Sequence, residues 1–212
     1  MNCCQCQGIE DLFNEKMVTK KLAQYRLKGP DKTTRIMVEA LKAEGIQGDS
    51  LIDIGGGVGA IQHELLNAGL WNAIDIDASN AYLTAARIEA QRLGLEDRIS
   101  FQHGNFVELA GQVPQADVIT LDRVICCYPD MEKLVGLSAS RAGKLYGLVY
   151  PRDGWWMKIG VAVLNILFWL QRKPFRSFVH STEAVDALVR SSGLKRRFYS
   201  RTLFWQVVIY AR

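Results

Sequence analysis

A run of closely spaced glycines before residue 60 is the part of the sequence best suited to chemistry. Residues 51–54 are apolar apart from Asp53, and four glycines follow them: Gly55, Gly56, Gly57 and Gly59. Glycine allows the backbone to turn with positive φ and to approach a ligand closely. A helix that begins after such a turn, near Ala60, offers unpaired N–H groups and the positive end of its dipole. The segment therefore predicts a strand–turn–helix pocket for a nucleotide-type cofactor.

The carboxylate of Asp53 helps to choose between two kinds of cofactor. Gly55-x-Gly57-x-x-Ala60 satisfies the dinucleotide fingerprint, with acidic residues about 20 positions further on. A carboxylate two residues before the first glycine would repel a pyrophosphate, but it suits a ligand that carries a positive charge. We therefore favour a cationic ligand and keep an NAD(P)-dependent oxidoreductase as the alternative.

A second acidic segment follows about 20 residues later. Residues 72–76 predict a strand that leads into Asp75-Ile76-Asp77-Ala78-Ser79. Strand alternation places Asp75 and Asp77 on the same face, and carboxylate oxygens can accept hydrogen bonds from both hydroxyls of a ribose. We assign the ribose to Asp77, because it lies last, where the strand opens into the crevice of the sheet. Asp75 is the alternative.

The two segments resemble the first two motifs of the class I S-adenosylmethionine (SAM)-dependent methyltransferases. This resemblance implies SAM as the cofactor, a ligand with an ammonium, a sulfonium and no phosphate. In this family an acidic residue after the third strand contacts the adenine amine, and here Asn105 stands at that position in Gly104-Asn105-Phe106. An amide oxygen can still accept that hydrogen bond. The resemblance implies these cofactor-binding residues: Asp53, Gly55, Gly56, Gly57, Gly59, Asp77, Ala78, Asn105, Phe106 and Asp122.

Residues 117–130 resemble the family's fourth motif. In this family the residues after the fourth strand face the methyl group, which implies the following catalytic candidates: Asp122, Arg123, Cys126 and Tyr128. Methyl transfer is an in-line displacement that requires alignment in a dry pocket, so we expect Asp122 and Tyr128 to orient the acceptor. Cysteine more often serves as small apolar packing, and the three histidines stand at positions typical of structural histidines.

The elements that position these residues alternate between strands and helices. The expected strands are residues 51–54, 72–76, 99–102, 116–122, 144–150, 196–199 and 203–210. This order predicts an α/β fold, with a Rossmann-like seven-stranded mixed sheet flanked by helices. The sheet is expected to be parallel except for one antiparallel C-terminal strand. Dehydrogenases keep the last strand parallel, which is a second argument for the methyltransferase interpretation.

We interpret the chain as one methyltransferase domain with four parts. These are an N-terminal helical lid (1–48), a SAM-binding core (49–150), a roof segment over the acceptor (151–180), and a final helix and hairpin (181–212). The lid is expected to contain one helix from Ile9 to Leu27 and another from Lys32 to Glu44, with Asp31 as its cap. In the family such N-terminal helices form a lid over the cofactor, so the resemblance makes Tyr25 and the Gly29–Thr33 loop lid candidates. A helix that only packs on the edge of the sheet is the alternative.

The roof segment contains a helical stretch, Trp155–Leu170, that is apolar nearly all round. Such a helix is either buried or at an interface, and this one is too short to cross a bilayer. We expect it to cover an acceptor pocket, with a homodimer interface or a membrane-surface contact as alternatives. The segment Arg172–Phe178 supplies cations next to this apolar helix. The acceptor is predicted to be a small, planar or lipophilic molecule, with O-methylation favoured. The layout is similar to that of the magnesium-protoporphyrin O-methyltransferases.

Composition narrows the remaining classes of function. The net charge is +4 and the basic residues are scattered, which argues against a nucleic-acid-binding stripe. The five cysteines stand in two clusters, a pattern typical of a reducing cytoplasm and not of a disulfide framework. Neither cluster has a second Cys/His pair at zinc spacing, so no metal site is expected. A non-catalytic partner protein that keeps the fold is the third functional alternative.

Overall fold

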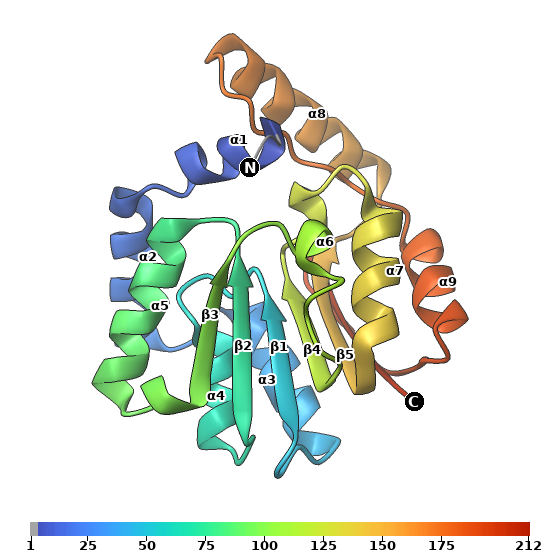
Figure 1. Cartoon of the computed structure of the whole chain (residues 1–212). Helices are drawn as coiled ribbons and strands as arrows, with labels where there is room; N and C mark the ends of the chain where they lie inside the picture. The colour runs from blue at the N-terminus through green and yellow to red at the C-terminus, as the bar shows by residue number, and fades with distance from the viewer. Residues whose placement is uncertain (1–3) are drawn as a thin grey trace.

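The computed structural model describes residues 4–212, with side chains from residue 8 onward, and contains a seven-stranded mixed sheet (Figure 1). The strands are β1 (Ser50–Ile54), β2 (Asn72–Asp77), β3 (Ile99–His103), β4 (Ala116–Asp122), β5 (Ala142–Pro151), β6 (Lys195–Arg201) and β7 (Trp205–Ala211). Their order is β3-β2-β1-β4-β5-β7-β6. Neighbours among β1 to β5 pair in parallel, while β7 is antiparallel to both β5 and β6. The predicted fold class, with its one antiparallel C-terminal strand, is confirmed.

Helices cover both faces of this sheet. The helices of the described chain are α1 (Cys4–Leu12), α2 (Glu15–Lys28), α3 (Lys32–Ala43), α4 (Ala60–Asn67), α5 (Asn80–Leu93), α6 (Phe106–Leu109), α7 (Met131–Arg141), α8 (Trp155–Leu170) and α9 (Thr182–Ser191). Strand alternation divides the core in two. Val118 packs with the α3–α4 side, whereas its neighbour Ile119 packs with the α7–α9 side.

The strand order reverses direction at β1, which has β2 on one side and β4 on the other. At such a switch point the loops after the two strands diverge to opposite faces and leave a crevice at their carboxyl ends. In Figure 1 the carboxyl ends of β1, β2, β3 and β4 point to the same edge, and α1 and α8 lie above that edge. The fold thus brings the N-terminal and roof segments over the crevice.

Two expectations for the N-terminal segment are wrong. The helix predicted over Ile9–Leu27 is two helices, because Asn14 accepts a hydrogen bond from the Met17 backbone N–H (3.2 Å) and caps α2. Asp31 does precede α3, but its side chain makes no capping hydrogen bond. Its carboxylate instead binds Arg123, 92 residues away.

The roof segment is an insertion between β5 and α9, as its place in the sequence predicted, and α8 is its main element. None of the 16 residues of α8 is buried. The chain returns from α8 through Phe175, whose backbone lies so close to α1 that a Cβ on Gly8 would be 2.6 Å from its nitrogen. Within the described residues no helix has the length and apolarity needed to cross a membrane.

Candidate functional site

A cavity of about 480 Å³ lies at the carboxyl ends of the parallel strands. Most of its walls come from three parts of the chain: the N-terminal segment, the loops after β1, β2, β3 and β4, and the roof segment. All the glycines of the predicted turn except Gly59 line it, as do Asp77, Ala78, Asn105, Phe106, Asp122, Arg123, Cys126 and Tyr128. The structure therefore brings nearly all the predicted site residues to one cavity. The exceptions are Asp53 and Gly59.

The glycine turn has a backbone that other residues rarely adopt. Gly55, Gly57 and Gly59 have φ values of +69°, +60° and +81°, in the left-handed region that glycine enters without strain. Gly56 is required for a different reason, since a Cβ there would lie 2.5 Å from Oδ1 of Asp75. The turn ends in α4, which begins at Ala60 as predicted. This geometry fits a ligand held against bare backbone.

Asp77 is fixed at the end of β2 by two backbone hydrogen bonds. Its Oδ2 accepts from the Gly57 N–H (3.1 Å) and its Oδ1 accepts from the Ser79 N–H (2.8 Å). Burial raises the pKa of this carboxyl to about 6, although the two N–H donors lower it. Each oxygen keeps a lone pair that can accept from a ribose hydroxyl. Asp77 thus fits the predicted role.

Asp75 points away from the cavity. It is fully buried and its Oδ2 accepts a hydrogen bond from the Gln62 amide (2.8 Å). Burial, with the nearby charges of Asp53 and Asp77, raises the pKa of its carboxyl well above the usual range. The geometry therefore favours Asp77 over Asp75 for the ribose.

Asp53 lies beneath the glycine turn and does not form part of the cavity wall. Its side chain is fully buried, Oδ1 accepts from the Thr120 hydroxyl (2.8 Å), and Oδ2 lies 3.1 Å from where a Cβ on Gly56 would be. Burial raises the pKa of its carboxyl to about 7. The direct contact with a cationic ligand that the sequence suggested is absent from this arrangement. Asp53 lies closest to the cavity at Gly56, which separates its Oδ2 from the lining.

Asn105 joins the adenine side of the predicted pocket to the loop after β4. Its Oδ1 accepts from the Val107 N–H (3.1 Å) and caps α6, while its amide donates to the Tyr128 hydroxyl (3.2 Å). Phe106 is buried behind it and borders the cavity. An Asn at this position therefore holds two elements together, a role the sequence did not indicate.

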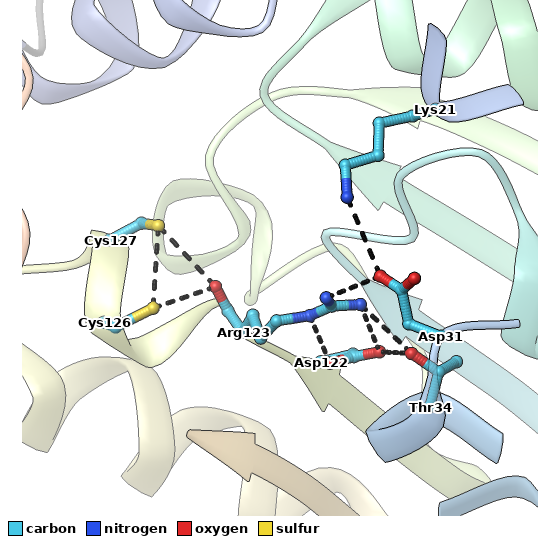
Figure 2. Close-up of polar contacts among 7 residues, drawn as sticks. All are labelled: Lys21, Asp31, Thr34, Asp122, Arg123, Cys126 and Cys127. Carbon is cyan, nitrogen blue, oxygen red and sulfur yellow. Dashed lines mark hydrogen bonds and ion pairs between the residues drawn. The ribbon is translucent and has the colours of Figure 1, made fainter. Parts of the chain in front are cut away.

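The end of β4 carries an ion-pair network that reaches the N-terminal helices (Figure 2). Arg123 donates from Nε to Asp122 (2.9 Å), from Nη1 to Asp31 (2.9 Å) and from Nη2 to the Thr34 hydroxyl (3.1 Å). The Thr34 hydroxyl in turn donates to Asp122. Arg123 has a φ of +62°, rare for a residue with a side chain. Its guanidinium thus ties α3 and the loop before it to the core.

The charges of the network support each other. Burial alone would disfavour the Arg123 cation, but the two carboxylates raise its pKa above the ordinary value. Burial likewise would raise the pKa of Asp31, yet Arg123 and Lys21 together lower it. Sequence reasoning named Asp31 only as part of the Gly29–Thr33 loop, and it missed Thr34 and Lys21 as members of the site. That loop carried no indication that Arg123 is the partner of Asp31.

Two adjacent thiols lie on the short 3₁₀ turn after β4, residues Ile125–Cys127. Their sulfur atoms are 3.8 Å apart, and Cys126 Sγ donates to the Arg123 carbonyl (3.1 Å). The hydrogen bond with Cys127, together with burial, raises the pKa of Cys126 well above the usual range. A neutral thiol is a poor nucleophile, so the geometry gives Cys126 a packing role.

None of the three histidines lines the cavity. His180 Nε2 lies 2.9 Å from the Ile125 carbonyl and 3.0 Å from the Tyr128 carbonyl, so it holds the turn after β4. Burial lowers the pKa of His63 to about 4. His103 lies beside the Ala78 carbonyl. The site therefore presents no histidine base to a ligand, and the described residues contain no cluster of three metal-ligating side chains.

The outer part of the cavity is apolar. It is lined by residues of the N-terminal segment and the roof segment, with one from β7: Ile9, Leu12, Phe13, Leu164, Phe168, Phe175 and Trp205. Phe13 and Phe168 both pack edge-on against Phe175. The cations predicted beside the pocket, Arg172, Lys173 and Arg176, do not line it.

Comparisons with known proteins agree with this arrangement. Residues 47–156 match a family model described as a methyltransferase domain. Magnesium protoporphyrin IX methyltransferase from Synechocystis PCC 6803, solved with bound SAH, superposes with a TM-score of 0.75 at 19% identity, covering 98% of this chain and 99% of that one. No curated protein matches the sequence.

Two further solved structures share the fold. A putative sarcosine dimethylglycine methyltransferase from Galdieria sulphuraria gives a TM-score of 0.67 at 12% identity and covers 85% of both chains. An O-methyltransferase family 2 protein from Planctomyces limnophilus DSM 3776, in complex with apigenin, gives 0.62 at 16% identity and covers 87% of this chain and 62% of that one. Because the family model spans more than half of the chain, the chain belongs to the methyltransferase-domain family, and the structures with bound SAM and SAH agree with a class I methyltransferase that has SAM as its cofactor.

Proposed function

We propose that the protein transfers a methyl group from SAM to a small, planar or lipophilic acceptor, with a hydroxyl or carboxyl oxygen as the favoured methyl-accepting atom. The observation that carries this proposal is the continuity of one cavity, which runs from the glycine turn and Asp77 to an apolar end lined by Phe168 and Phe175. Cofactor and acceptor can therefore meet in one cavity.

At the inner end of the cavity, the residues fit SAM by complementary chemistry. The Gly55–Gly59 turn accommodates the amino-acid part of SAM against bare backbone, and Asp77 accepts from the ribose hydroxyls. Asn105 and Phe106 border the position of the adenine. When bound, SAM supplies an electrophilic methyl group on a positively charged sulfur.

The protein's own contribution to the reaction is positioning. The cavity has no histidine, the Cys126 thiol is neutral, and both carboxylate oxygens of Asp122 accept hydrogen bonds from Arg123. We therefore infer that Asp122 and Arg123 fix the wall beside the methyl group, while the Tyr128 hydroxyl orients the acceptor. Alignment at near-attack distance in a dry pocket can by itself account for a large acceleration.

Two observations support an aromatic acceptor: the apolar lining of the cavity at the roof segment (the roof end of the cavity) and the related structures. Apigenin is planar and binds the Planctomyces limnophilus protein, and the Synechocystis enzyme is named for a porphyrin substrate. The apolar side chains at the roof end would pack on such a ring. A macrocycle and a smaller phenol are both consistent with this chemistry.

The proposed setting is the cytoplasm, with a small molecule and not a nucleic acid as the substrate. The clustered cysteines support a reducing compartment, and Cys126 and Cys127 are thiols in the structure. The NAD(P)-dependent alternative is disfavoured by the antiparallel β7 and the family assignment. A non-catalytic partner protein remains the second candidate, because α8 leaves an apolar surface exposed.

Calorimetry followed by a turnover assay tests this proposal. The purified protein should bind SAM and SAH but not NAD⁺, and should add one methyl group, detected by mass, to at least one compound in a panel of flavonoids, porphyrins and simple phenols. A heat of binding with NAD⁺ and no heat of binding with SAM would overturn the proposal. SAM binding with no turnover on any acceptor would favour the non-catalytic partner.

A further inference from the structure

Helix α8 has an exposed apolar surface that the cavity does not explain. Trp155, Ile159 and Trp169 are 74%, 57% and 67% exposed, and five other large apolar side chains of the helix are also exposed: Val163, Leu164, Ile166, Leu167 and Leu170. A monomer in water rarely keeps so many apolar side chains together on its surface. We therefore expect this surface to be covered by a binding partner.

The exposed surface continues beyond the helix to the tip of the last hairpin. Trp156 packs edge-on against Phe204 with ring centroids 5.8 Å apart, and both Leu203 and Phe204 are exposed. We name α8 together with Leu203 and Phe204 the apolar platform. Figure 1 shows α8 at the outer edge of the molecule, above the carboxyl ends of the strands. The platform is thus accessible to a large flat partner.

The polar groups of the roof segment hold α8 in place. Asn165 is the one uncharged polar residue of the helix, and its amide donates to the Ser177 carbonyl (2.8 Å) and accepts from the Ser177 N–H (2.9 Å). Phe168 packs on Phe175 on the same inner side. These contacts fix which face of α8 turns inward, so the exposed face is a stable feature of the fold.

The charged residues between Gly154 and Thr182 are all cations. Between Asp153 and Glu183 the sequence has no carboxylate but has four cations: Lys158, Arg172, Lys173 and Arg176. Arg152 lies over the Trp156 ring, 6.0 Å from its centroid. A second copy docked on α8 would bring the same cations to the interface, with no carboxylate from residues 154–182 to pair with them. An anionic partner, in contrast, would attract all of them.

Length and side-chain types identify that partner as a lipid surface. A helix of 16 residues is about 24 Å long, shorter than the hydrocarbon core of about 30 Å. Its tryptophans stand at both ends, and tryptophan prefers the boundary between headgroups and acyl chains. Apolar side chains with flanking Lys and Arg are the features of helices that lie in that boundary.

We propose that the apolar platform docks the protein on an anionic lipid membrane, with α8 lying in the plane of the interface. Leu164 and Phe168 line the cavity from this helix. Resting on the proposed function, docking would let a lipophilic acceptor pass from the membrane to the cavity without crossing water. The docking surface itself does not depend on the identity of the acceptor.

The test is co-sedimentation of the whole protein with vesicles of phosphatidylcholine alone and of phosphatidylcholine mixed with phosphatidylglycerol. The wild-type protein should bind the mixed vesicles at least about tenfold more tightly, and added salt should weaken that binding. Trp fluorescence should shift to shorter wavelength on binding. No binding to the mixed vesicles, or equal binding to both kinds, would overturn the proposal.

Matched variants distinguish specific binding through the platform from nonspecific binding through any exposed apolar side chain. Ile166→Glu and Trp169→Ser lie on the platform, while Ile88→Glu and Trp71→Ser alter side chains that are similarly exposed elsewhere. The platform variants should lose at least about tenfold in vesicle affinity, because a charge or a lost indole is costly in the interface. The other two should bind as the wild type does. Equal losses in both pairs would contradict the assignment.

Two further measurements distinguish this inference from its rivals. Light scattering without lipid should give a monomer; a dimer that Ile166→Glu dissociates would make a second copy the partner and overturn the proposal. The variant Gly57→Val should keep its vesicle binding even though it cannot bind SAM. Failure of SAM binding in the wild type would therefore end the proposed function and leave the docking surface intact.

Discussion

The inner end of the cavity is polar and buried, whereas the roof end is apolar and mostly exposed. At the inner end Asp77 is held by two backbone N–H groups, and a Cβ on Gly56 would overlap Asp75. At the roof end α8 has no buried residue. A cofactor shared across a family requires fixed geometry, and an acceptor that differs between members does not. We therefore expect the cofactor end of the site, and not the acceptor end, to carry a short sequence pattern.

Arg123 joins the end of β4 to the N-terminal segment that borders the cavity. Its side chain ties Asp31 and Thr34 of the N-terminal segment to Asp122 at the end of β4, and its carbonyl accepts from Cys126 (Figure 2). A residue with a φ of +62° persists only when its surroundings hold it. Variants at the inner end should therefore change SAM affinity, and variants in this network should change amide exchange and kcat/KM. A variant in the turn Ile125–Cys127 should change turnover.

The largest effect is expected at the glycine turn. Gly57→Val should weaken SAM binding at least about a hundredfold, because valine is strained at a φ of +60° and its branches would enter the cavity. Calorimetry with SAM measures the affinity, and circular dichroism checks the fold. Gly111→Val is the control, since Gly111 has open space around it and lies outside the cavity. Wild-type affinity in Gly57→Val would move the cofactor away from this turn.

Asp77→Ala should weaken SAM binding by about 1–3 kcal/mol, because two ribose hydroxyls lose their acceptor. Asp75→Asn is the comparison: SAM affinity should be nearly unchanged, since Asp75 lies beneath the turn, and the thermal midpoint should rise at high pH, where the variant removes a buried carboxylate. Isothermal calorimetry and thermal unfolding separate the two outcomes. Unchanged affinity in Asp77→Ala would transfer the ribose role to Asp75.

Arg123→Gly should lower kcat/KM for the acceptor about tenfold while relieving the strained φ. The physical reason is the loss of the ties to Asp31 and Thr34, which should also speed amide hydrogen exchange in α2 and α3. Arg172→Gly provides a matched control, because Arg172 also has positive φ (+55°) but stands outside the network. Slow exchange in Arg123→Gly would show that the N-terminal helices are held by other contacts.

The buried carboxyl of Asp53 gives a pH-dependent expectation. Its pKa is raised by burial to about 7, so between pH ~4 and pH ~7 the folded protein binds this proton more tightly than the unfolded chain does. Its contribution to stability is therefore greatest at low pH and is lost as pH rises toward 7. Asp53→Asn should raise the thermal midpoint above pH 7 by a few degrees. It should also flatten the dependence of that midpoint on pH.

The same variant tests how Asp53 acts on the cofactor. An amide still accepts from the Thr120 hydroxyl, so the packing beneath Gly56 is preserved. If Asp53 acts only through the turn, the affinity for SAM should change less than it does in Asp77→Ala. A loss as large as that of Asp77→Ala would instead restore the direct electrostatic role that the sequence suggested.

The sequence predicts the inner end of the site better than the rest, and local chemistry is the reason. The turn at Gly55–Gly59, the start of α4 at Ala60 and the antiparallel β7 follow from residue types and their spacing. The break at Asn14 was missed because it depends on one capping side chain. The bond between Asp31 and Arg123 joins residues 92 positions apart, and no local pattern in one sequence encodes such a partner.

The smallest effect is expected for Cys126→Ala, which should change turnover by no more than about twofold. The neighbouring thiol and burial keep Cys126 protonated near neutral pH, and its sulfur is committed to the Arg123 carbonyl. A protonated thiol can neither attack a methyl group nor remove a proton from an acceptor. Alanine removes little volume from a turn that His180 also holds.

Single-turnover assays with saturating SAM measure the chemical step directly. A large loss of rate with unchanged SAM affinity would place a reactive group on the wall beside the methyl group, and positioning alone would no longer describe that wall.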